Sequence, residues 1–383
     1  MKVVADRQVE QAEHFLGPLG PVTVADLSTA PGAVLAAADV LVVRSNVKVG
    51  RALLEGTPVR CVATATSGTD HIDTAWLAER GIACLDARGS NAAAVAEYIV
   101  AACLRLSGMQ ARPLVGLQVG VVGCGAVGSR VVEMVAALGM PAPLVCDPPR
   151  QRAAEDPAQF CDLPTLLGGC DVITLHVPLT QCGRDRTAGL IDAAALQQMR
   201  RGAWLINTSR GGVVDESASI AARRAGRLAG LVVDVWQAEP AGDAALLDVA
   251  DFMTPHIAGQ TPAARVRGTW QAARGIAAWA GLPLSRVATL GLPAVTKVAT
   301  DEQERPESAL TSVVETCCDI VGCDRAVRES ASAGLIGGRT FVEEARKLCP
   351  MRREFASLQV VRSGSGVRVE RLGPVELWKL GFS

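Results

Sequence analysis

Three short segments each carry one side chain suited to proton or carboxylate chemistry. They are NTSRGG with Arg210, DVWQAEP with Glu239 and TPHIAG with His256. An arginine fork matches a carboxylate bidentately, and a histidine accepts a proton near neutral pH. A nearby carboxylate orients such a histidine and stabilises its charged form. Together the three side chains offer the functions that hydride removal from a 2-hydroxy acid requires.

Each of these residues also has an ordinary structural explanation. His256 could be a satisfied histidine at a strand end, Glu239 a turn residue before a proline, and Arg210 a surface cation. The functional interpretation is favoured because all three follow apolar, strand-like runs, and open α/β sheets bind ligands at the carboxyl ends of their strands.

The other three histidines are weaker candidates for proton transfer. His14 is expected at the surface, and His71 lies in a loop. His176 follows a strand-like run, but no carboxylate lies near it in the sequence.

A glycine-rich turn directly follows the apolar run at 119–122 and opens a helical pattern. Its residues are Gly123, Cys124, Gly125, Ala126, Val127 and Gly128. Such a turn brings backbone amides and a helix N-terminus to a pyrophosphate. Its alternative is a turn that binds nothing, and the strand before it and the helix after it argue against that.

An acidic residue ends the next strand-like run. Asp147 stands 19 residues after Gly128. A carboxylate there accepts hydrogen bonds from a ribose diol and repels a 2′-phosphate, so the cofactor is expected to be NAD. Arg150, three residues further on, keeps NADP open as the alternative.

A loop near the N-terminus has the composition of an anion clamp. Arg44, Ser45 and Lys48 put two cations and a hydroxyl just after an apolar run, which suits a phosphate. A solvated basic loop is the alternative. The backbone amides around Ser67 and Gly68 could hold a carboxylate.

The elements that must position these residues follow from the hydrophobic pattern. The first 90 or so residues alternate short apolar runs with alanine-rich helical stretches, which predicts a small parallel α/β layer. A helical pattern from Asn91 then leads into a second series of apolar strands separated by helices. This series predicts a doubly wound sheet buried on both faces. Its strands are expected at 118–122, 144–146, 172–175, 204–206 and 231–235.

The pattern changes after a long helical stretch at 263–280. Residues 297–308 look like a connection, and a separate C-terminal α+β domain is expected beyond them. Its elements are a helix at 309–321, a loop rich in Gly and Ser, a helix at 342–348 and short strands near 358–361 and 367–369.

Composition excludes several classes of protein. The 383 residues carry 38 basic and 39 acidic side chains, and 49% of them are apolar, so disorder and a nucleic-acid partner are not expected. Charged residues interrupt every apolar stretch before the roughly 18 residues of a membrane helix, and the N-terminus does not resemble a signal peptide. No membrane partner is therefore expected.

The twelve cysteines are scattered through apolar segments without a CxxC pair. We interpret them as small buried side chains in a reduced cytoplasm, with no metal site. The cluster of Cys317, Cys318 and Cys323 leaves another role open.

These motifs together resemble the NAD-dependent D-isomer 2-hydroxyacid dehydrogenases. The resemblance rests on the glycine-rich turn with Asp147, the HVPLT run at 176–180 and the segments around Arg210, Glu239 and His256. Further motifs narrow it to members that oxidise a phosphorylated acid, and it extends to the C-terminus. They lie at 43–49, 64–73, 89–98, 146–150, 267–269, 352–355 and 379–382.

The resemblance implies an α/β fold and an enzyme. The fold is a Rossmann cofactor domain (95–257) inserted into a smaller flavodoxin-like substrate domain (1–94 and 258–284), with a C-terminal dimerisation domain (285–383) that pairs homodimers. Arg210 would fix the substrate carboxylate and polarise the C2 oxygen. His256 would take the C2 hydroxyl proton as hydride leaves for NAD, and Glu239 would support the imidazolium.

The resemblance also implies contacts to a small phosphorylated 2-hydroxy acid and to the cofactor. Substrate contacts are expected at Ser45, Thr66 and position 260. Cofactor contacts are expected at Asp147, Val177, Thr208, Ser209, Arg210, Asp234 and Gly259.

Three departures from the family pattern bear on the identity of the substrate. Ala5-Asp6-Arg7 replaces a familiar Asp-Glu-Asn, Asn46-Val47 alters the anion loop, and Gln260 stands where a substrate-binding tyrosine is expected. The alternatives are a dehydrogenase for another 2-hydroxy acid, such as a phosphoglycerate, and a non-catalytic NAD-sensing protein of the same fold.

Overall fold

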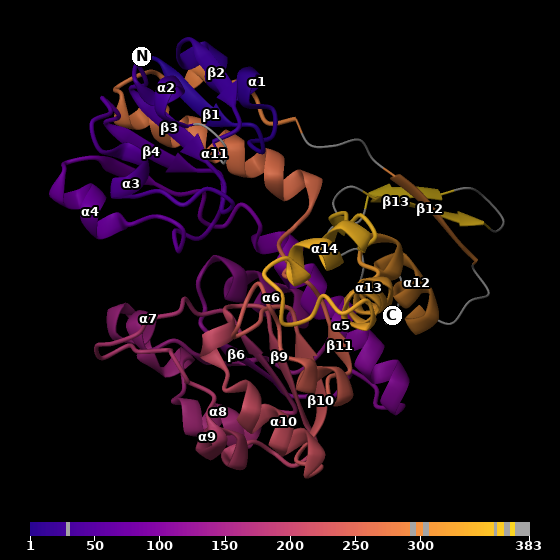
Figure 1. Ribbon diagram of the computed structural model, residues 1–383. Coiled ribbons are helices and arrows are strands. Elements are labelled where there is room, and N and C mark those ends of the chain that lie inside the picture. The colour runs from indigo at the N-terminus through magenta and orange to yellow at the C-terminus, as the bar shows by residue number, and fades with distance from the viewer. Residues whose placement is uncertain (28–30, 292–295, 302–305, 356–357, 364–367, 372–383) are drawn as a thin grey trace. The chain divides into compact units, whose positions relative to one another are not determined.

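The computed structural model describes residues 1–27, 31–291, 296–301, 306–355, 358–363 and 368–371. The chain forms two compact units (Figure 1). Unit 1 comprises Met1–Asn91 and Thr261–Ala294, and unit 2 comprises Ala92–Gln260 and Val295–Ser383. Unit 2 thus begins as an insertion into unit 1. The motif expected at 379–382 lies outside the described residues.

Unit 1 is built on a five-stranded parallel sheet of the order β2-β1-β3-β4-β5. This is the flavodoxin-like order that the resemblance implies. The strands are β1 (Val3–Asp6), β2 (Val22–Ala25), β3 (Val40–Val43), β4 (Cys61–Thr64) and β5 (Ala83–Leu85).

Burial of both faces explains why the central strands of unit 1, β1, β3 and β4, are mostly apolar on both sides. Val40 and Val42 of β3 belong to one hydrophobic core, and Leu41 and Val43 belong to the opposite one. One core is closed by α1 (Ala12–Leu16) and α11 (Pro262–Trp279), and the other by α2 (Pro31–Leu35), α3 (Arg51–Leu54) and α4 (Thr74–Glu79).

Unit 2 contains a six-stranded parallel sheet of the order β11-β10-β9-β8-β6-β7. The chain passes from β6 to β7 on one side and then crosses to β8 on the other, so the strand order reverses beside β6. Doubly wound sheets bind dinucleotides at such a point. The strands are β6 (Val119–Val122), β7 (Leu144–Cys146), β8 (Val172–Leu175), β9 (Ala203–Asn207), β10 (Leu228–Val233) and β11 (Phe252–Met253).

Helices cover both faces of this sheet. The face that includes Val121 and Ile206 packs against α5 (Ala92–Gln110) and α6 (Ala126–Ala137). The face that includes Ile173 and Leu205 packs against α8 (Leu163–Gly169), α9 (Ala193–Gln198) and α10 (Glu216–Arg224), and α7 (Pro148–Ala153) follows β7.

The central helix α5 is long and apolar enough to cross a membrane by length and composition. However, 72% of its apolar window is buried inside the protein, as in the core helix of a folded domain.

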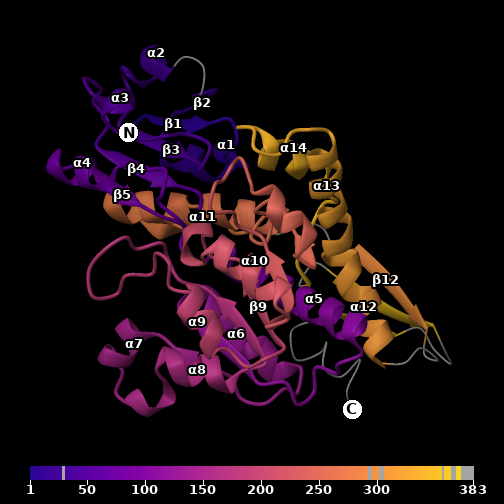
Figure 2. The same cartoon turned by 60° about the horizontal axis from the view of Figure 1, so that its bottom comes forward.

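The C-terminal part of unit 2 contains α12 (Pro306–Cys317), α13 (Ile320–Ser332) and α14 (Phe341–Leu348), with β12 (Thr296–Asp301), β13 (Leu358–Ser363) and β14 (Arg368–Arg371). Figures 1 and 2 both show α12 and α13 beside α5. Val314 and Ile320 join the core of α5, whereas Val327 and Phe341 join the core on the other face. The described helices therefore share their cores with the six-stranded sheet, and the domain boundary expected at 285 stays a prediction.

Two expectations for this region are wrong. Residues 297–308 are not a mere connection, because β12 pairs in parallel with β13, about 60 residues away. The loop expected between 321 and 342 begins only at Ala333, because residues 320–332 form helix α13. Asp319 caps its first turn, and Ile320, Cys323 and Val327 recur at helical spacing on its buried side.

The buried Leu166 on α8 provides a test of the packing in unit 2. We expect Leu166→Ala to lower the free energy of unfolding by about 2–5 kcal/mol, because it deletes a fully buried side chain. Leu348→Ala, at a side chain that is 59% exposed, is the matched control and should change it by less than about 0.5 kcal/mol. Urea denaturation measures both values, and equal values would contradict the packing described.

Candidate active site

The three segments singled out for chemistry leave neighbouring strands at one edge of the sheet in unit 2. Asn207, at the end of β9, pairs with Val233 of β10, which pairs with Met253 of β11. Since the strands are parallel, the residues that follow all three begin at the same carboxyl edge. Arg210, Glu239 and His256 lie in these loops.

His256 and Glu239 are in direct contact. Glu239 Oε1 lies 2.8 Å from His256 Nδ1, and Oε2 lies 3.0 Å from it. Both side chains are partly exposed, at 38% for His256 and 29% for Glu239. The contact assigns Nδ1 to the carboxylate, which leaves Nε2 for a ligand.

Glu239 is held in its ionised form. Burial raises the pKa of Glu239, but the hydrogen bond and charge of His256, together with the charge of Arg346, outweigh burial and lower that pKa. Arg346 on α14 lies 4.0 Å from Oε1 and also donates to the carbonyl of Pro255. The pair therefore has the charge distribution that a general base supported by a carboxylate requires.

The loop that carries His256, residues 254–259, is held by hydrogen bonds to Asp234. This fully buried carboxylate accepts hydrogen bonds from the amides of Ile257 (2.8 Å) and Ala258 (3.0 Å) and from the hydroxyl of Thr254 (2.6 Å). His256 itself has a backbone φ of +55°, a value that residues other than glycine rarely adopt. Asp234 thus acts on the loop, and its expected contact with the cofactor stays a prediction.

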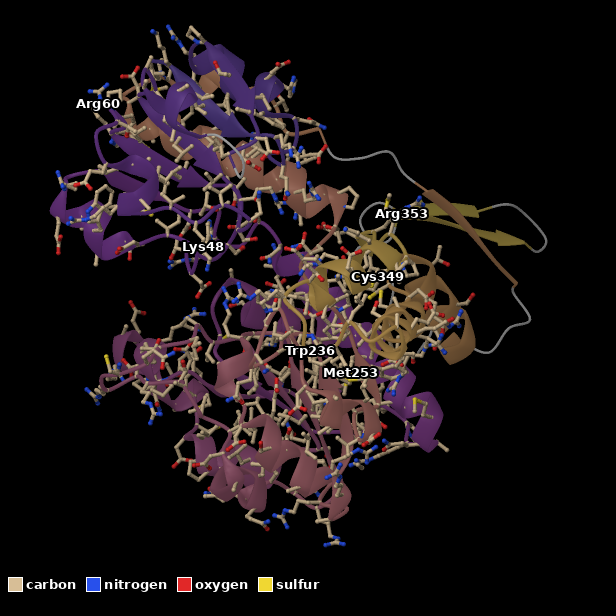
Figure 3. All side chains as sticks on the ribbon, viewed as in Figure 1. Lys48, Arg60, Trp236, Met253, Cys349 and Arg353 are labelled. Atoms are coloured by element: carbon tan, nitrogen blue, oxygen red, sulfur yellow. The ribbon has the colours of Figure 1, made fainter. Side chains whose placement is uncertain are left out.

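The turn that carries Arg210 is organised by Asn207. The Asn207 side chain donates to the carbonyl of Arg210 and accepts hydrogen bonds from the amide and hydroxyl of Ser209. A Cβ built on Gly211 would stand 2.0 Å from the carbonyl oxygen of Trp236, so this glycine lets the turn pack against the segment that leads to Glu239. Figure 3 labels Trp236, whose indole nitrogen donates to the carbonyl of Thr254.

The glycine-rich turn has the geometry of a dinucleotide loop. Gly123 has a φ of +87°, and a Cβ at Gly128 would stand 2.0 Å from the carbonyl oxygen of Gly123. A Cβ at Gly125 would meet no atom within 4 Å, so space is open where a ligand would approach. Gly125 is the N-cap of α6, and among the described residues no side chain caps this helix. These features fit a pyrophosphate at the helix N-terminus.

Asp147 lies beside this turn. Its carboxylate accepts hydrogen bonds from the amides of Cys124 (2.7 Å) and Arg150 (3.0 Å). The Arg150 side chain donates to the carbonyl of Cys124 and to the hydroxyl of Ser129. The Asp147 carboxylate therefore lies directly beside the glycine-rich turn, where the ribose of a bound dinucleotide is expected. The Arg150 side chain forms hydrogen bonds with residues of this turn and of α6.

The other expected cofactor residues lie around the same edge. The side chain of Val177 packs against Gly123, and Gly259 is the last residue of the His256 loop. The Thr208 hydroxyl is buried and finds no hydrogen-bond partner among the described residues. A buried hydroxyl without a partner costs free energy, so Thr208 fits a site that a polar ligand completes.

Unit 1 holds the residues expected to bind the substrate phosphate. Ser45 and Lys48 are exposed, but Arg44 is buried and its guanidinium lies 3.4 Å from the carbonyl oxygen of Ala65. Burial, together with the charge of Arg265, lowers the pKa of Arg44 to about 10. Arg44 therefore remains a cation at neutral pH, and it is not the solvated side chain of the alternative interpretation.

Two of the departures from the family pattern are in contact. The Asn46 amide donates to the buried carboxylate of Asp6 at 3.2 Å. Asp6 also accepts from the amides of Gln8 and Leu27. The changed N-terminal motif and the changed anion loop are thus connected by a hydrogen bond between their side chains.

A hydrogen-bonded chain runs behind the expected substrate contact Thr66. The Thr66 hydroxyl lies 2.7 Å from that of Thr64, which lies 3.1 Å from Nε2 of His71. Burial lowers the pKa of His71 to about 4, so this histidine is neutral and structural. The hydroxyl of neighbouring Ser67 donates to the Asn91 side chain.

His176 and Gln260 do not join the catalytic pair. Burial lowers the pKa of His176 to about 3, and its Nε2 lies 3.0 Å from the hydroxyl of Thr174. Gln260 is partly buried, and its amide donates to the carbonyl of Ile257. Among the described residues, no group of three potential ligands is placed to hold a metal ion.

Sequence reasoning missed four residues of these sites. Tyr98, Thr254 and Asn207 hold loops, and Arg265 adds a cation near Arg44. Three of them lie within quoted motifs. Arg265 lies outside those motifs. Thr261 is a typical N-cap residue, and this signal could have predicted that Arg265 lies in the first turn of α11.

Comparisons with known proteins agree with this geometry. Residues 92–258 match the family model of the D-isomer specific 2-hydroxyacid dehydrogenase, NAD binding domain. The erythronate-4-phosphate dehydrogenase of Salinibacter ruber is 46% identical over 76% of each chain, and that of Edwardsiella ictaluri is 40% identical over 94% of this chain and 95% of its own.

Among solved structures, the TT0316 protein of Thermus thermophilus has a TM-score of 0.59 at 26% identity and covers 74% of this chain and 98% of its own. The D-lactate dehydrogenase of Aquifex aeolicus, solved with NAD and lactic acid, shares the fold, with a TM-score of 0.56 over 74% of this chain and 97% of its own. The chain belongs to the erythronate-4-phosphate dehydrogenases, a branch of the NAD-dependent D-isomer specific 2-hydroxyacid dehydrogenases.

Proposed function

We propose that this protein oxidises 4-phospho-D-erythronate to 2-oxo-3-hydroxy-4-phosphobutanoate with NAD, a step of pyridoxal 5′-phosphate biosynthesis. The observation that carries the chemistry is the pair of Glu239 and His256, 2.8 Å apart at the sheet edge that also carries the glycine-rich turn. The names of the similar enzymes support this choice of substrate.

The reaction needs a base for one proton and an acceptor for one hydride. NAD, when bound, supplies the hydride acceptor. Nε2 of His256 takes the proton of the C2 hydroxyl while the C2–H bond breaks and its electron pair leaves with the hydrogen. The C2–O bond becomes a carbonyl, and Glu239 stabilises the imidazolium through Nδ1.

Arg210 would complete this chemistry by binding the substrate carboxylate and the C2 oxygen. The backbone of its turn is fixed by Asn207 and by the close approach of Gly211 to Trp236, and its guanidinium donates to the carbonyl of Ser209 at 2.8 Å. An arginine in that role recognises the carboxylate and stabilises the negative charge that develops on oxygen.

Unit 1 would recognise the phosphate. Burial and the charge of Arg265 lower the pKa of Arg44, whereas the carboxylates of Glu10 and Asp6 oppose that shift, and Glu10 lies 3.5 Å from Arg265. Lys48 and Arg44 each lower the pKa of His71. A dianionic phosphate would be attracted by the positive charges of Arg44 and Lys48. We therefore assign the phosphate to Arg44, Ser45 and Lys48, and the substrate carboxylate end to Thr66 and the amides of Ser67 and Gly68.

The assembly and the compartment are also proposals. We propose a homodimer formed through residues 285–383 and a cytoplasmic location. Each of the twelve cysteines, all of which lie in the described part of the chain, is free, which is consistent with a reducing compartment.

The first test removes the base. His256→Ala is expected to lower kcat by about 10²–10⁴-fold, because a general base contributes about that much, while NAD binding is preserved. His14→Ala, at an exposed histidine of unit 1, is the matched control. NAD reduction with 4-phospho-D-erythronate, 3-phosphoglycerate and erythronate measures the rates, and an unchanged kcat in His256→Ala would overturn the mechanism.

The second test removes the carboxylate that contacts His256. Glu239→Gln keeps the size of the side chain but loses the negative charge that stabilises the imidazolium, so kcat/KM should fall by about 10- to 100-fold. Glu344→Gln is the control, because the Glu344 carboxylate pairs with Lys347 on α14, and it should keep the parent's value. Steady-state kinetics measure both values, and an unchanged kcat/KM in Glu239→Gln would contradict the pairing.

The third test concerns the phosphate. Lys48→Met should raise KM for the phosphorylated acid by about 10- to 100-fold with little change in kcat, because it removes a charge-assisted hydrogen bond. Arg51→Met, an exposed cation on α3, is the control. Steady-state kinetics with phosphorylated and unphosphorylated erythronate give the comparison. Equal use of both acids by the parent enzyme would refute the phosphate site.

A further inference from the structure

Arg352, which follows α14 near the end of the described chain, is buried inside unit 2 with an exposed fraction of 3%. Its guanidinium donates to the carbonyls of Ile257 (2.8 Å) and Ala258, to that of Ala94 (2.9 Å), and to the sulfur of Cys318 (3.1 Å). In Figure 3, the labelled Cys349 and Arg353 mark the segment that supplies it. A buried arginine with this many donors engaged restricts every group that it contacts.

Two of those carbonyls belong to the His256 loop, directly after His256. Asp234 accepts the amide hydrogens of the same two residues, Ile257 and Ala258. Both residues are therefore held on their N–H side by a buried carboxylate and on their C=O side by a buried guanidinium. Few rotations of the backbone are compatible with both.

The other contacts of Arg352 extend this arrangement to α5. The guanidinium carbon lies 5.5 Å from the centroid of the Tyr98 ring, and the Tyr98 hydroxyl lies 2.6 Å from that of Thr254, at the start of the His256 loop. Ala94 lies in the first turn of α5. Arg352 thus links both ends of the loop to a helix of the core.

We infer that Arg352 is a positioning residue for His256, which it holds through the carbonyls of Ile257 and Ala258. The inference depends on the proposed role of His256 as the base. The φ of +55° at His256 costs free energy and persists only where the surroundings impose it. Without Arg352 the carbonyls of Ile257 and Ala258 lose this donor, and only the amide side of both residues stays held by Asp234. The backbone after His256 then gains freedom, and the alignment of the imidazole with Glu239 loosens.

The test replaces Arg352 by Met, which keeps an unbranched side chain and removes all donors, and by Lys, which keeps the charge but not the fork. The matched control is Arg223→Met. Arg223 donates to the carbonyls of Val249 (3.1 Å) and Leu228 (3.0 Å) and pairs with Asp251 at 2.7 Å. Arg223 lies on α10, and its side chain contacts the amino end of β10, opposite to the edge that carries the His256 loop.

An activity-independent measurement comes first. The chain has four histidines, so ¹³C-labelled histidine gives few NMR signals, and His256→Ala assigns the one of interest. In Arg352→Met the His256 signal should shift or broaden, while Arg223→Met leaves it unchanged. This holds whichever acid is the substrate, so it separates a failure of this inference from a failure of the proposed function.

Kinetics give the second measurement. Arg352→Met should lower kcat by about 10- to 100-fold and alter the pH profile of kcat/KM, because misplacing a reacting group by about 1 Å has effects of that size. Arg352→Lys should lose less. A folded Arg352→Met with the parent's kcat, pH profile and His256 signal would overturn the inference. If Arg352→Met does not fold, the same parent values in Arg352→Lys would overturn it, because a single ammonium cannot span three carbonyls and a sulfur.

Discussion

The position of the imidazole depends on one buried carboxylate. Asp234 ends a strand of the central sheet, is completely buried, and accepts hydrogen bonds from Thr254, Ile257 and Ala258. A carboxylate in that place would be costly without such donors. The three donors satisfy it, and by doing so they fix the loop on either side of His256. The position of His256 is thus set by a requirement of the core, before any ligand is considered.

Much of this arrangement could be predicted from the sequence, because its causes are local. Apolar strands such as β6 and β9 indicate a parallel sheet buried on both faces, and the carboxyl ends of such strands converge. That argument predicted Arg210, Glu239 and His256 at one edge. It did not predict that the side chains of His256 and Glu239 are in contact, because that contact depends on the conformations of two separate loops.

Contacts between distant segments could not be predicted from the sequence. Tyr98 and Thr254 are 156 residues apart, and Arg352 and Ala94 are 258 apart. Neither pair has a periodic or spacing signal that would join it. For the same reason β12 was expected to be a connection, since its partner strand β13 comes after three helices. Helix α13 is a different case, because the sequence does contain its signals. They are the N-cap residue Asp319 and the helical spacing of Ile320, Cys323 and Val327. The glycines and serines nearby favoured a loop instead.

The two units hold their buried charges in different ways. Unit 2 buries Asp234 and Arg352 on the two sides of one loop, whose amides and carbonyls satisfy them, and this gives rigidity. Unit 1 buries Arg44, whose pKa is lowered by burial and by the charge of Arg265 and is raised by the carboxylates of Glu10 and Asp6. The net charge of −1 is therefore uninformative about the substrate. In the proposed reaction, selectivity for an anion would depend on how a few cations are placed relative to one another, and the catalytic step would depend on charges whose partners are already inside the protein.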